Sequence, residues 1–323
     1  MSVRTAVIGL GIMGRRMVKR MALHPGFSPV ALWDPDKDAC QAAQALAPNA
    51  EVTQSAQAAI EMADLVYLAC PPAPRKSYAM VAADAGKAVF LEKPLGVDVA
   101  ESTELVAHLK ARGVPAAVNF TQAAGAALAG VDHAARTGAL GDLAGADIIV
   151  TYAAWPRAWQ KAADWLRYRD EGGMTREVIS HFLFFSERIL GPLTVSWASP
   201  SFPDDPALCE THLSARLETK EGLPVTVMAS VGGAQPDRQE LTIKGSQASR
   251  RISEFYIDAV SDGGPFTEVA ERPSDPRATS LNAQLDDLLL CVERQPHRLA
   301  KPEEALRVQI LVEQMLSGFR VSR

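Results

Sequence analysis

The first third of the chain alternates short apolar runs with segments whose apolar residues recur at helical spacing. Thr5–Gly9 is an apolar run that ends in glycine, and Ile12–Leu23 follows with a helical pattern. This predicts a strand, a turn and a helix. The same alternation continues to residue 118, with further strands expected at Pro29–Trp33, Leu65–Ala69, Ala88–Leu91 and Pro115–Val118, and further helices at Lys37–Leu46, after Pro74 and at Asp98–Ala111. Strands alternating with helices predict a parallel, doubly wound sheet.

Beyond Asn119 the pattern changes, because strands now follow one another with few helices between them. An alanine-rich helix to Arg136 leads to strands expected at Ala146–Tyr152, Leu193–Ala198, Thr211–Thr219, Val225–Val231, Gln239–Lys244 and Ser249–Ile257, and a final helix is expected at Glu303–Leu316. Such a series predicts an antiparallel sheet. A length of 323 residues suits two domains. We therefore expect an α/β Rossmann domain over residues 1–120 and, over residues 121–323, an α+β domain with a large open, mainly antiparallel sheet that binds substrate and forms oligomer contacts.

A glycine-rich motif lies between the first strand and the first helix. Its glycines are Gly9, Gly11 and Gly14, in the spacing G-x-G-x-x-G. In a dinucleotide-binding turn the first glycine allows the tight bend, the second lets the pyrophosphate approach and the third lets helix and strand pack closely. Asp34 ends the second strand, where its carboxylate can accept hydrogen bonds from a ribose diol. NAD is preferred over NADP because a 2′-phosphate would meet this charge, although Lys37 softens the repulsion. The alternative is a plain glycine turn with an aspartate capping a helix.

The strand expected at Ala88–Leu91 is followed by Glu92-Lys93-Pro94. Ligands bind at the carboxyl ends of parallel strands. A lysine there, partly removed from water, can have its pKa lowered enough to relay a proton. Taken alone, Lys93 is better explained as a solvated lysine before a proline turn.

A second candidate lies in the segment from Glu171 to His181, where a glycine pair precedes a strongly apolar helix. Glu177 and His181 are four residues apart and therefore share one helix face. Both are titratable groups on an otherwise apolar helix, so both need partners. The alternative for His181 is a core histidine whose hydrogen bonds are satisfied internally.

Together these motifs resemble the glucose-fructose oxidoreductase and inositol dehydrogenase (Gfo/Idh/MocA) family. The resemblance runs from the glycine loop through Cys70-Pro71-Pro72, Ala85-Gly86-Lys87 and Glu92-Lys93-Pro94 to the helix with His181 and the segment 301–308. It implies hydride transfer between nicotinamide and a substrate held between the two domains, with Lys93 and His181 passing the proton and Glu177 at the position usually held by a catalytic aspartate. The cofactor contacts expected are Gly9, Gly11, Ile12, Met13, Gly14, Asp34, Cys70, Pro71, Glu92 and Lys93.

The sequence departs from the family pattern at two further places. The segment after the fourth strand reads Pro71-Pro72-Ala73-Pro74-Arg75-Lys76, where the family often has a histidine, and Asn119-Phe120 is followed by Thr121-Gln122-Ala123-Ala124, where arginines are common. Aromatic and arginine side chains gather in residues 152–169. Because aromatic rings stack on sugars and arginines hold carboxylates, they suit a sugar, sugar acid or cyclic polyol, although a subunit interface has the same composition. The candidate substrate residues are Asn119, Trp155, Arg157, Trp165 and Arg176.

Composition narrows the choice of partners. A net charge of −5 gives no basic field for nucleic acid or an anionic membrane, so a small-molecule substrate is expected. The four cysteines are far apart and form no C-x-x-C pair, so we expect buried thiols and no metal site. The start of the chain lacks the pattern of a signal peptide, and no segment approaches the ~18 apolar residues of a membrane span, which favours a cytoplasmic protein. A homo-oligomer, dimer or tetramer, is expected through the C-terminal sheet.

The function that these observations favour is an NAD(P)-dependent dehydrogenase acting on a carbohydrate-like alcohol or carbonyl. Reduction of an imine or of a non-sugar carbonyl is an alternative, because the fold does not fix the substrate. A non-catalytic dinucleotide sensor or partner subunit is an alternative of another class, which the glutamate at position 177 keeps open. Retention of both Lys93 and His181 counts against it, since binding alone does not require them.

Overall fold

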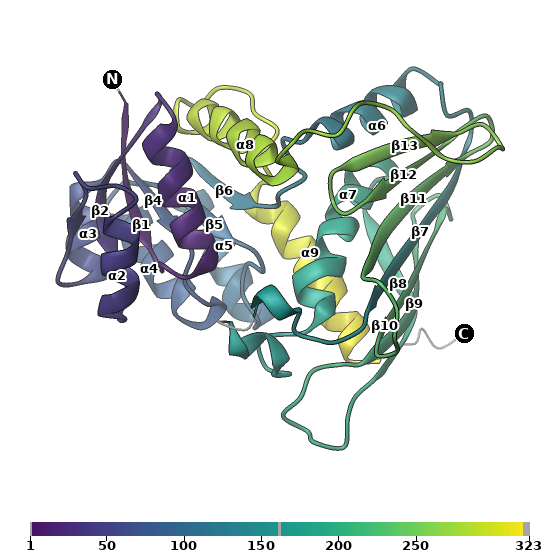
Figure 1. The fold of residues 1–323 in the computed structure, drawn as a ribbon, viewed down its shortest axis with the longest axis horizontal. Coiled ribbons are helices and arrows are strands. Elements are labelled where there is room, and N and C mark those ends of the chain that lie inside the picture. Colours follow the sequence, from purple (N-terminus) through teal and green to yellow (C-terminus); the bar gives the residue numbers. More distant parts are fainter. Residues whose placement is uncertain (1, 161–162, 319–323) are drawn as a thin grey trace. The chain divides into compact units, whose positions relative to one another are not determined.

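The computed structural model describes residues 2–160 and 163–318, which form two compact units (Figure 1). The first unit comprises the described residues up to Ala123 together with Ala278–Leu306. The second comprises the described residues of 124–277 together with those from Arg307 onward. Each unit has its own sheet.

The first unit is built on a six-stranded parallel sheet with the order β3-β2-β1-β4-β5-β6. The chain reverses its direction of travel across the sheet between β1 and β4, the position at which doubly wound sheets bind ligands. A parallel sheet is covered on both faces, so its strands are continuous apolar runs, and all four residues of β4 are buried. The predicted α/β doubly wound fold is confirmed. The strands are β1 (Val3–Ile8), β2 (Phe27–Trp33), β3 (Glu51–Val52), β4 (Leu65–Leu68), β5 (Ala88–Glu92) and β6 (Ala116–Asn119).

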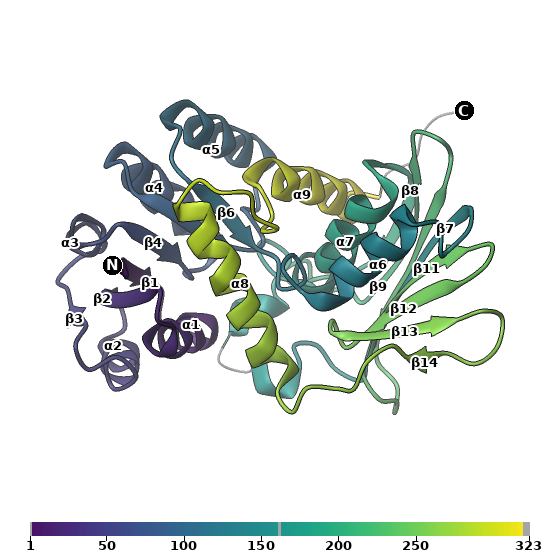
Figure 2. The same cartoon turned by 90° about the horizontal axis from the view of Figure 1, so that it is seen from above.

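Helices cover both faces of this sheet (Figure 2). On one face α1 packs with α2, and on the other α3, α4 and α5 form a row. Three of these helices begin with a capping side chain that accepts a hydrogen bond from a backbone N–H of the first turn, which satisfies a donor at the helix start. The capping residues are Asp36 for α2, Ser55 for α3 and Asp98 for α5. The short helix α3 was not predicted. The bounds are α1 (Ile12–Leu23), α2 (Lys37–Gln44), α3 (Ala56–Met62), α4 (Pro72–Asp84) and α5 (Val99–Arg112).

A long helix that the sequence analysis missed, α8 (Pro276–Val292), packs almost entirely within the first unit. It buries Leu281, Leu285 and Leu288, which recur at helical spacing, and its Ser280 hydroxyl donates to the Thr121 carbonyl at 2.6 Å. Residues 278–306 were assigned to the second domain from sequence, but by their contacts they belong to the first unit. The apolar face of α8 is the physical reason, since it must be covered to be stable. The division of function between residues 1–120 and 121–323 stays a prediction.

The second unit is built on an eight-stranded sheet with the order β14-β13-β12-β11-β7-β10-β9-β8. Its neighbouring strands are antiparallel except for β7 and β10, which are parallel. The helices α6 (Ala126–Arg136) and α7 (Ser180–Leu190) lie against one face, and the C-terminal part of α9 (Pro302–Leu316) belongs to the same unit. The predicted open, mainly antiparallel sheet is confirmed. The strands are β7 (Leu143–Tyr152), β8 (Leu193–Ser201), β9 (His212–Thr219), β10 (Pro224–Val231), β11 (Arg238–Gly245), β12 (Ser249–Ser253), β13 (Ile257–Ser261) and β14 (Thr267–Glu268).

The single strand predicted at Ser249–Ile257 is wrong, because this segment forms the hairpin of β12 and β13. The chain reverses through Glu254 and Phe255, whose φ angles of 51° and 68° lie in the left-handed region. Hairpin turns of this kind normally carry glycine, asparagine or aspartate. The segment has none of these at the two central positions, so no turn was expected.

Two expectations from composition concern thiols and membrane spans. Cys40, Cys70, Cys209 and Cys291 are free and buried, as predicted, and burial raises the pKa of the Cys291 thiol to about 11. Across residues 2–160 and 163–318, no helix is both long enough and apolar enough to cross a membrane.

Replacing Asp287 by alanine is expected to lower the free energy of unfolding by about 1–3 kcal/mol. The Asp287 side chain is 4% exposed and accepts hydrogen bonds from the backbone N–H of Arg298 at 2.5 Å and from its guanidinium at 2.6 Å. The neighbouring Asp286 side chain is 71% exposed and pairs with His24, so Asp286→Ala should cost under ~1 kcal/mol. Urea denaturation of both variants checks this, and equal losses would contradict it.

Candidate functional site

The three glycines of the cofactor loop have different surroundings. A Cβ on Gly9, whose φ is +91°, would lie 2.3 Å from the backbone nitrogen of Cys70, and a Cβ on Gly14 would lie 1.9 Å from the Gly9 carbonyl oxygen. Gly11 precedes α1 as its N-cap, and a Cβ there would meet nothing within 4 Å. Gly9 and Gly14 are therefore required by packing, whereas Gly11 leaves the start of α1 open. This fits the approach of a pyrophosphate to free N–H groups at a helix start.

Asp34 follows β2 and is tied to the glycine loop. Its Oδ2 accepts the backbone N–H of Leu10 at 2.6 Å, and its Oδ1 accepts that of Asp36 at 2.9 Å. The N-cap of α2 is Asp36, so the alternative interpretation of Asp34 as a helix cap is wrong. A carboxylate oxygen has more than one acceptor site, so these bonds orient Asp34 and leave it able to accept a ribose hydroxyl.

The predicted cofactor residues lie on loops or strand ends at one edge of the parallel sheet. Gly9, Asp34, Cys70 and Lys93 follow β1, β2, β4 and β5, respectively. The others are Gly11, Ile12, Met13 and Gly14 at the start of α1, Pro71 before α4 and Glu92 at the end of β5. Because all these strands are parallel, their carboxyl ends meet at the same edge. The structure thus brings this set together, and contact of each residue with a nucleotide stays a prediction.

Glu92 is a buried carboxyl group at the end of β5, 6% exposed. Its Oε1 accepts hydrogen bonds from the Tyr67 hydroxyl and from the Asn119 amide at 2.6 Å. Burial raises the pKa of Glu92, while these hydrogen bonds and the charge of Lys93 oppose the rise. Asn119, which is predicted to bind substrate, is 1% exposed. Its amide nitrogen already donates to Glu92. Substrate contact by Asn119 stays a prediction.

Arg75 is a buried arginine whose role the sequence analysis did not anticipate. The residue is 2% exposed, and its guanidinium donates to the carbonyls of Cys70 at 2.5 Å, of Glu92 at 2.8 Å and of Pro94. These carbonyls belong to the loops after β4 and β5, on both sides of Lys93. Arg75 therefore fixes the backbone that carries Lys93. It lies in the segment where the sequence lacks the histidine of the related family.

The helix that carries Glu177 and His181 begins with an unusual turn. Thr175–Ile179 is a π-helix that continues directly into α7, and the Ser180 N–H donates to the Thr175 carbonyl five residues earlier. The sequence predicts an ordinary helix here. Wide turns of this kind are rare and occur often at functional sites. Glu177 is half-buried and His181 is 5% exposed.

The imidazole of His181 packs against the ring of Phe255, which in turn stacks on Phe182. Phe255 meets the imidazole edge-on at 5.3 Å between ring centroids and stacks on Phe182 at 5.4 Å. Phe255 stands in the left-handed turn between β12 and β13, where a bulky residue is conformationally strained. Sequence analysis missed Phe255, because neither the turn nor its packing against a helix 74 positions earlier left a local pattern.

Glu177 is connected to the arginine-rich segment through Gln160, another residue that was not predicted. The Gln160 amide donates to Glu177 Oε1 at 3.3 Å and accepts from Arg157 Nε at 2.9 Å. The guanidinium carbon of Arg157 lies 4.8 Å from the centroid of the Trp159 ring and 5.8 Å from that of Trp155. The structure therefore brings together Glu177, Arg157 and Trp155 from the predicted set.

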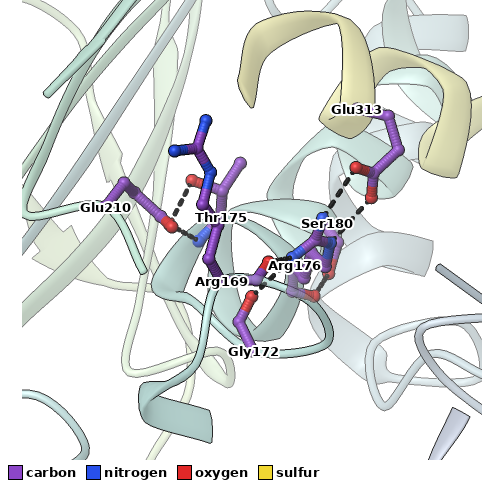
Figure 3. Close-up of polar contacts among 7 residues, drawn as sticks. All are labelled: Arg169, Gly172, Thr175, Arg176, Ser180, Glu210 and Glu313. Carbon is purple, nitrogen blue, oxygen red and sulfur yellow. Dashed lines mark hydrogen bonds and ion pairs between the residues drawn. The ribbon is translucent and has the colours of Figure 1, made fainter. Parts of the chain in front are cut away.

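The remaining candidates from this region are Trp165 and Arg176. Trp165 is half-buried in a 3-10 turn over Asp164–Arg167. Arg176 is 8% exposed and holds both carboxylate oxygens of Glu313 at 2.7 Å (Figure 3). Its guanidinium also donates to the carbonyls of Arg169 and Gly172. Arg176 thus anchors the start of the π-helix to α9, and substrate contact by either residue stays a prediction.

Lys93 belongs to the first unit, whereas Glu177 and His181 belong to the second. Their convergence on one substrate stays a prediction.

The comparisons with known proteins agree with the fold. Among the solved structures that resemble nearly the whole chain are the following two, whose sequence identities are low enough that the likeness concerns the fold alone. An oxidoreductase from Agrobacterium radiobacter, solved with NAD+, L-tartaric acid and magnesium, has a TM-score of 0.85, 16% identity and coverage of 98% of this chain and 97% of that chain. A 3-ketoreductase from Actinomadura kijaniata, solved with NADP and TDP-benzene, has a TM-score of 0.81, 20% identity and coverage of 99% and 98%, respectively.

Two sequence matches each cover about a third of the chain. Inositol 2-dehydrogenase 3 from Saccharopolyspora erythraea is 32% identical over 120 residues, which are 35% of this chain and 34% of that protein. The chain thus matches about a third of the length of this relative. Residues 3–120 match the family described as "Oxidoreductase family, NAD-binding Rossmann fold". Over residues 3–120 the chain matches the Gfo/Idh/MocA oxidoreductase family, which supports the resemblance inferred from its motifs over that range.

Proposed function

We propose that the protein is an NAD(P)-dependent dehydrogenase that acts on a carbohydrate-like alcohol or carbonyl. The observation that carries the proposal is the edge of the parallel sheet, where the open glycine loop, the oriented carboxylate of Asp34 and the fixed loop of Lys93 follow β1, β2 and β5. When bound at this edge, the nicotinamide accepts or returns a hydride. The chain itself must bind the substrate oxygen and move its proton.

Proton transfer is assigned to Lys93 and His181. Lys93 stands on a loop whose backbone Arg75 fixes on both sides, and His181 is restrained by Phe255. Such restraint suits general acid–base groups, which must be held within hydrogen-bond reach of the reacting oxygen. Glu177 is assigned an orienting or relay role, supported by its hydrogen bond with Gln160.

The substrate class proposed is a sugar, sugar acid or cyclic polyol. Trp155 and Trp159 present rings beside the guanidinium of Arg157, which is connected through Gln160 to Glu177. Rings of this kind pack on the apolar faces of sugars, and a guanidinium recognises a carboxylate. Arg157 therefore favours sugar acids within this class.

NAD is proposed as the preferred cofactor. The Asp34 carboxylate is held in place by two backbone N–H groups, so it cannot readily turn away from an incoming 2′-phosphate. Its negative charge would repel that group, whereas a 2′-hydroxyl can donate to it. A cytoplasmic location also stays a prediction.

The experiment that tests the function is a thermal-shift measurement with NAD, NADH, NADP and NADPH, followed by an absorbance screen at 340 nm over sugars, sugar acids, polyols and imines. We expect stabilisation, strongest with NAD or NADH, and turnover with a carbohydrate-like compound. Turnover with imines alone would overturn the substrate class, and stabilisation without turnover would favour a sensor. Absence of stabilisation by every nucleotide would overturn cofactor binding.

Lys93→Met is expected to lower kcat at least ~100-fold, because the proton relay is lost, while the thermal shift with nucleotide stays within error of the wild type. Lys110→Met is the matched control, since Lys110 is exposed on α5, and it should leave both values unchanged. Kinetics with the substrate found in the screen measures the effect. Full activity in the Lys93 variant would remove this residue from the mechanism.

Gly11→Ala and Gly14→Ala separate cofactor approach from packing. An added Cβ at Gly11 meets nothing within 4 Å, whereas at Gly14 it would overlap the Gly9 carbonyl. Gly11→Ala should therefore keep the Tm of the nucleotide-free protein and lose most of the shift given by nucleotide. Gly14→Ala should lower the Tm without nucleotide. Thermal unfolding with and without NAD measures both, and an undiminished shift in the Gly11 variant would speak against pyrophosphate binding there.

We also propose a homo-oligomer formed through the second unit's sheet. Met228 on β10 and Trp197 on β8 are large apolar side chains that are 58% and 40% exposed. Exposed apolar residues on a sheet face favour burial against another copy. Sedimentation should show a dimer or tetramer, and Met228→Arg should shift it toward the monomer with the Tm little changed. A wild-type monomer at micromolar concentration would refute the proposal.

A further inference from the structure

The helix that carries Glu177 and His181 starts at a buried carboxylate that no sequence motif singles out. Glu210 lies just before β9 and is 2% exposed. Its Oε1 accepts both the backbone N–H of Thr175 at 2.8 Å and the Thr175 hydroxyl at 2.6 Å (Figure 3). Thr175 is the first residue of the π-helix and is fully buried. Glu210 thus satisfies a donor that a helix start leaves without a partner inside the helix.

The glycine pair before the helix makes this contact possible. Gly173 has a φ of +102°, and a Cβ there would lie 2.4 Å from Glu210 Oε2. A Cβ on Gly172 would lie 2.3 Å from the Leu166 carbonyl oxygen. A side chain at position 172 would overlap backbone atoms, and at position 173 the positive φ is unfavourable for any residue but glycine. Gly173 thus lets the backbone come close to the carboxylate, and Gly172 lets it pass the Leu166 carbonyl, which explains why the pair precedes this helix.

The next residue, Arg176, is held from the other side of the helix start. Its guanidinium binds both oxygens of Glu313 on α9 (Figure 3), and its backbone carbonyl accepts the Ser180 hydroxyl at 2.7 Å. The two residues before Glu177 are thus fixed by two different carboxylates. Of these two carboxylates, only Glu210 accepts a hydrogen bond from a backbone N–H, that of Thr175, and we therefore take this contact to set where the first turn begins.

We infer that Glu210 is a positioning residue, which sets the start of the π-helix through Thr175 and thereby the placement of Glu177 and His181. The inference rests on the proposed function, because it gives Glu177 and His181 their catalytic roles. Displacement of a reacting group by about 1 Å can cost ~100-fold in rate. A shift of the helix start is therefore expected to reduce kcat more than it changes the KM for the nucleotide, whose predicted contacts all lie in the first unit.

The test compares Glu210→Gln, Glu210→Ala and the exposed control Glu221→Ala. Glutamine keeps an oxygen that can accept both bonds, so Glu210→Gln should retain kcat within about threefold. Glu210→Ala should lower kcat at least ~10-fold, with the KM for nucleotide within about twofold and amide hydrogen exchange faster across residues 175–181. Glu221→Ala should change none of these. A folded Glu210→Ala variant with near wild-type kcat and unchanged exchange would overturn the inference.

A Thr175 pair keeps the test decisive if Glu210→Ala does not fold. Thr175→Val removes the hydroxyl and keeps the N–H bond, so kcat should fall about 3–10-fold, and Thr175→Ser should restore it. Equal kcat in both would overturn the role of this contact. If the wild type turns over no substrate, the proposed function fails on its own, and hydrogen exchange still decides the inference. Local loss of protection at 175–181 in the Glu210 or Thr175→Val variant supports it, and unchanged protection refutes it.

Discussion

The burial of Arg75 beside the carboxyl edge of the parallel sheet is the constraint on which the arrangement of the predicted cofactor residues depends. A buried guanidinium needs hydrogen-bond acceptors, and here three backbone carbonyls accept from its two terminal nitrogens. Because those carbonyls belong to Cys70, Glu92 and Pro94, the hydrogen bonds of this one side chain fix the backbone after β4 and on both sides of Lys93. The buried carboxyl group of Glu92 accepts hydrogen bonds from Tyr67 and Asn119 and thereby also fixes the end of β5. Lys93 is therefore carried on a rigid part of the fold.

In the second unit, too, a buried charged side chain is hydrogen-bonded to backbone, here at the start of a helix. Buried carboxylates are stable only where hydrogen bonds or charges compensate for the loss of water. Glu210 meets this condition through Thr175, whose hydrogen bonds oppose the rise that burial causes in the pKa of Glu210. The half-buried Glu313 in turn pairs with the buried guanidinium of Arg176. In both units a buried charge holds backbone beside a titratable group. Such groups are costly for stability, which suits a role in placing residues for chemistry.

The sequence predicted those features that have a local pattern. Five strands of the parallel sheet are apolar runs, and the glycine loop has a fixed spacing, so both were found, whereas the two-residue strand β3 was not. Helix α8 also has a local pattern in Leu281, Leu285 and Leu288 and could have been predicted. The contacts of Arg75 and Glu210 could not, because their partners lie 17 and 35 positions away and only the folded chain brings them together. The turn at Phe255 was hidden because its left-handed residues are not glycines.

The glutamate at position 177 is a departure from the family pattern that the structure accommodates with residues of this chain. An aspartate there would end about one bond length, ~1.5 Å, short of the present carboxylate, and would lose the 3.3 Å contact with Gln160. The longer side chain thus reaches a glutamine that Arg157 holds in turn. The pairing of Glu177 with Gln160 is therefore the observation on which the orienting role proposed for Glu177 rests.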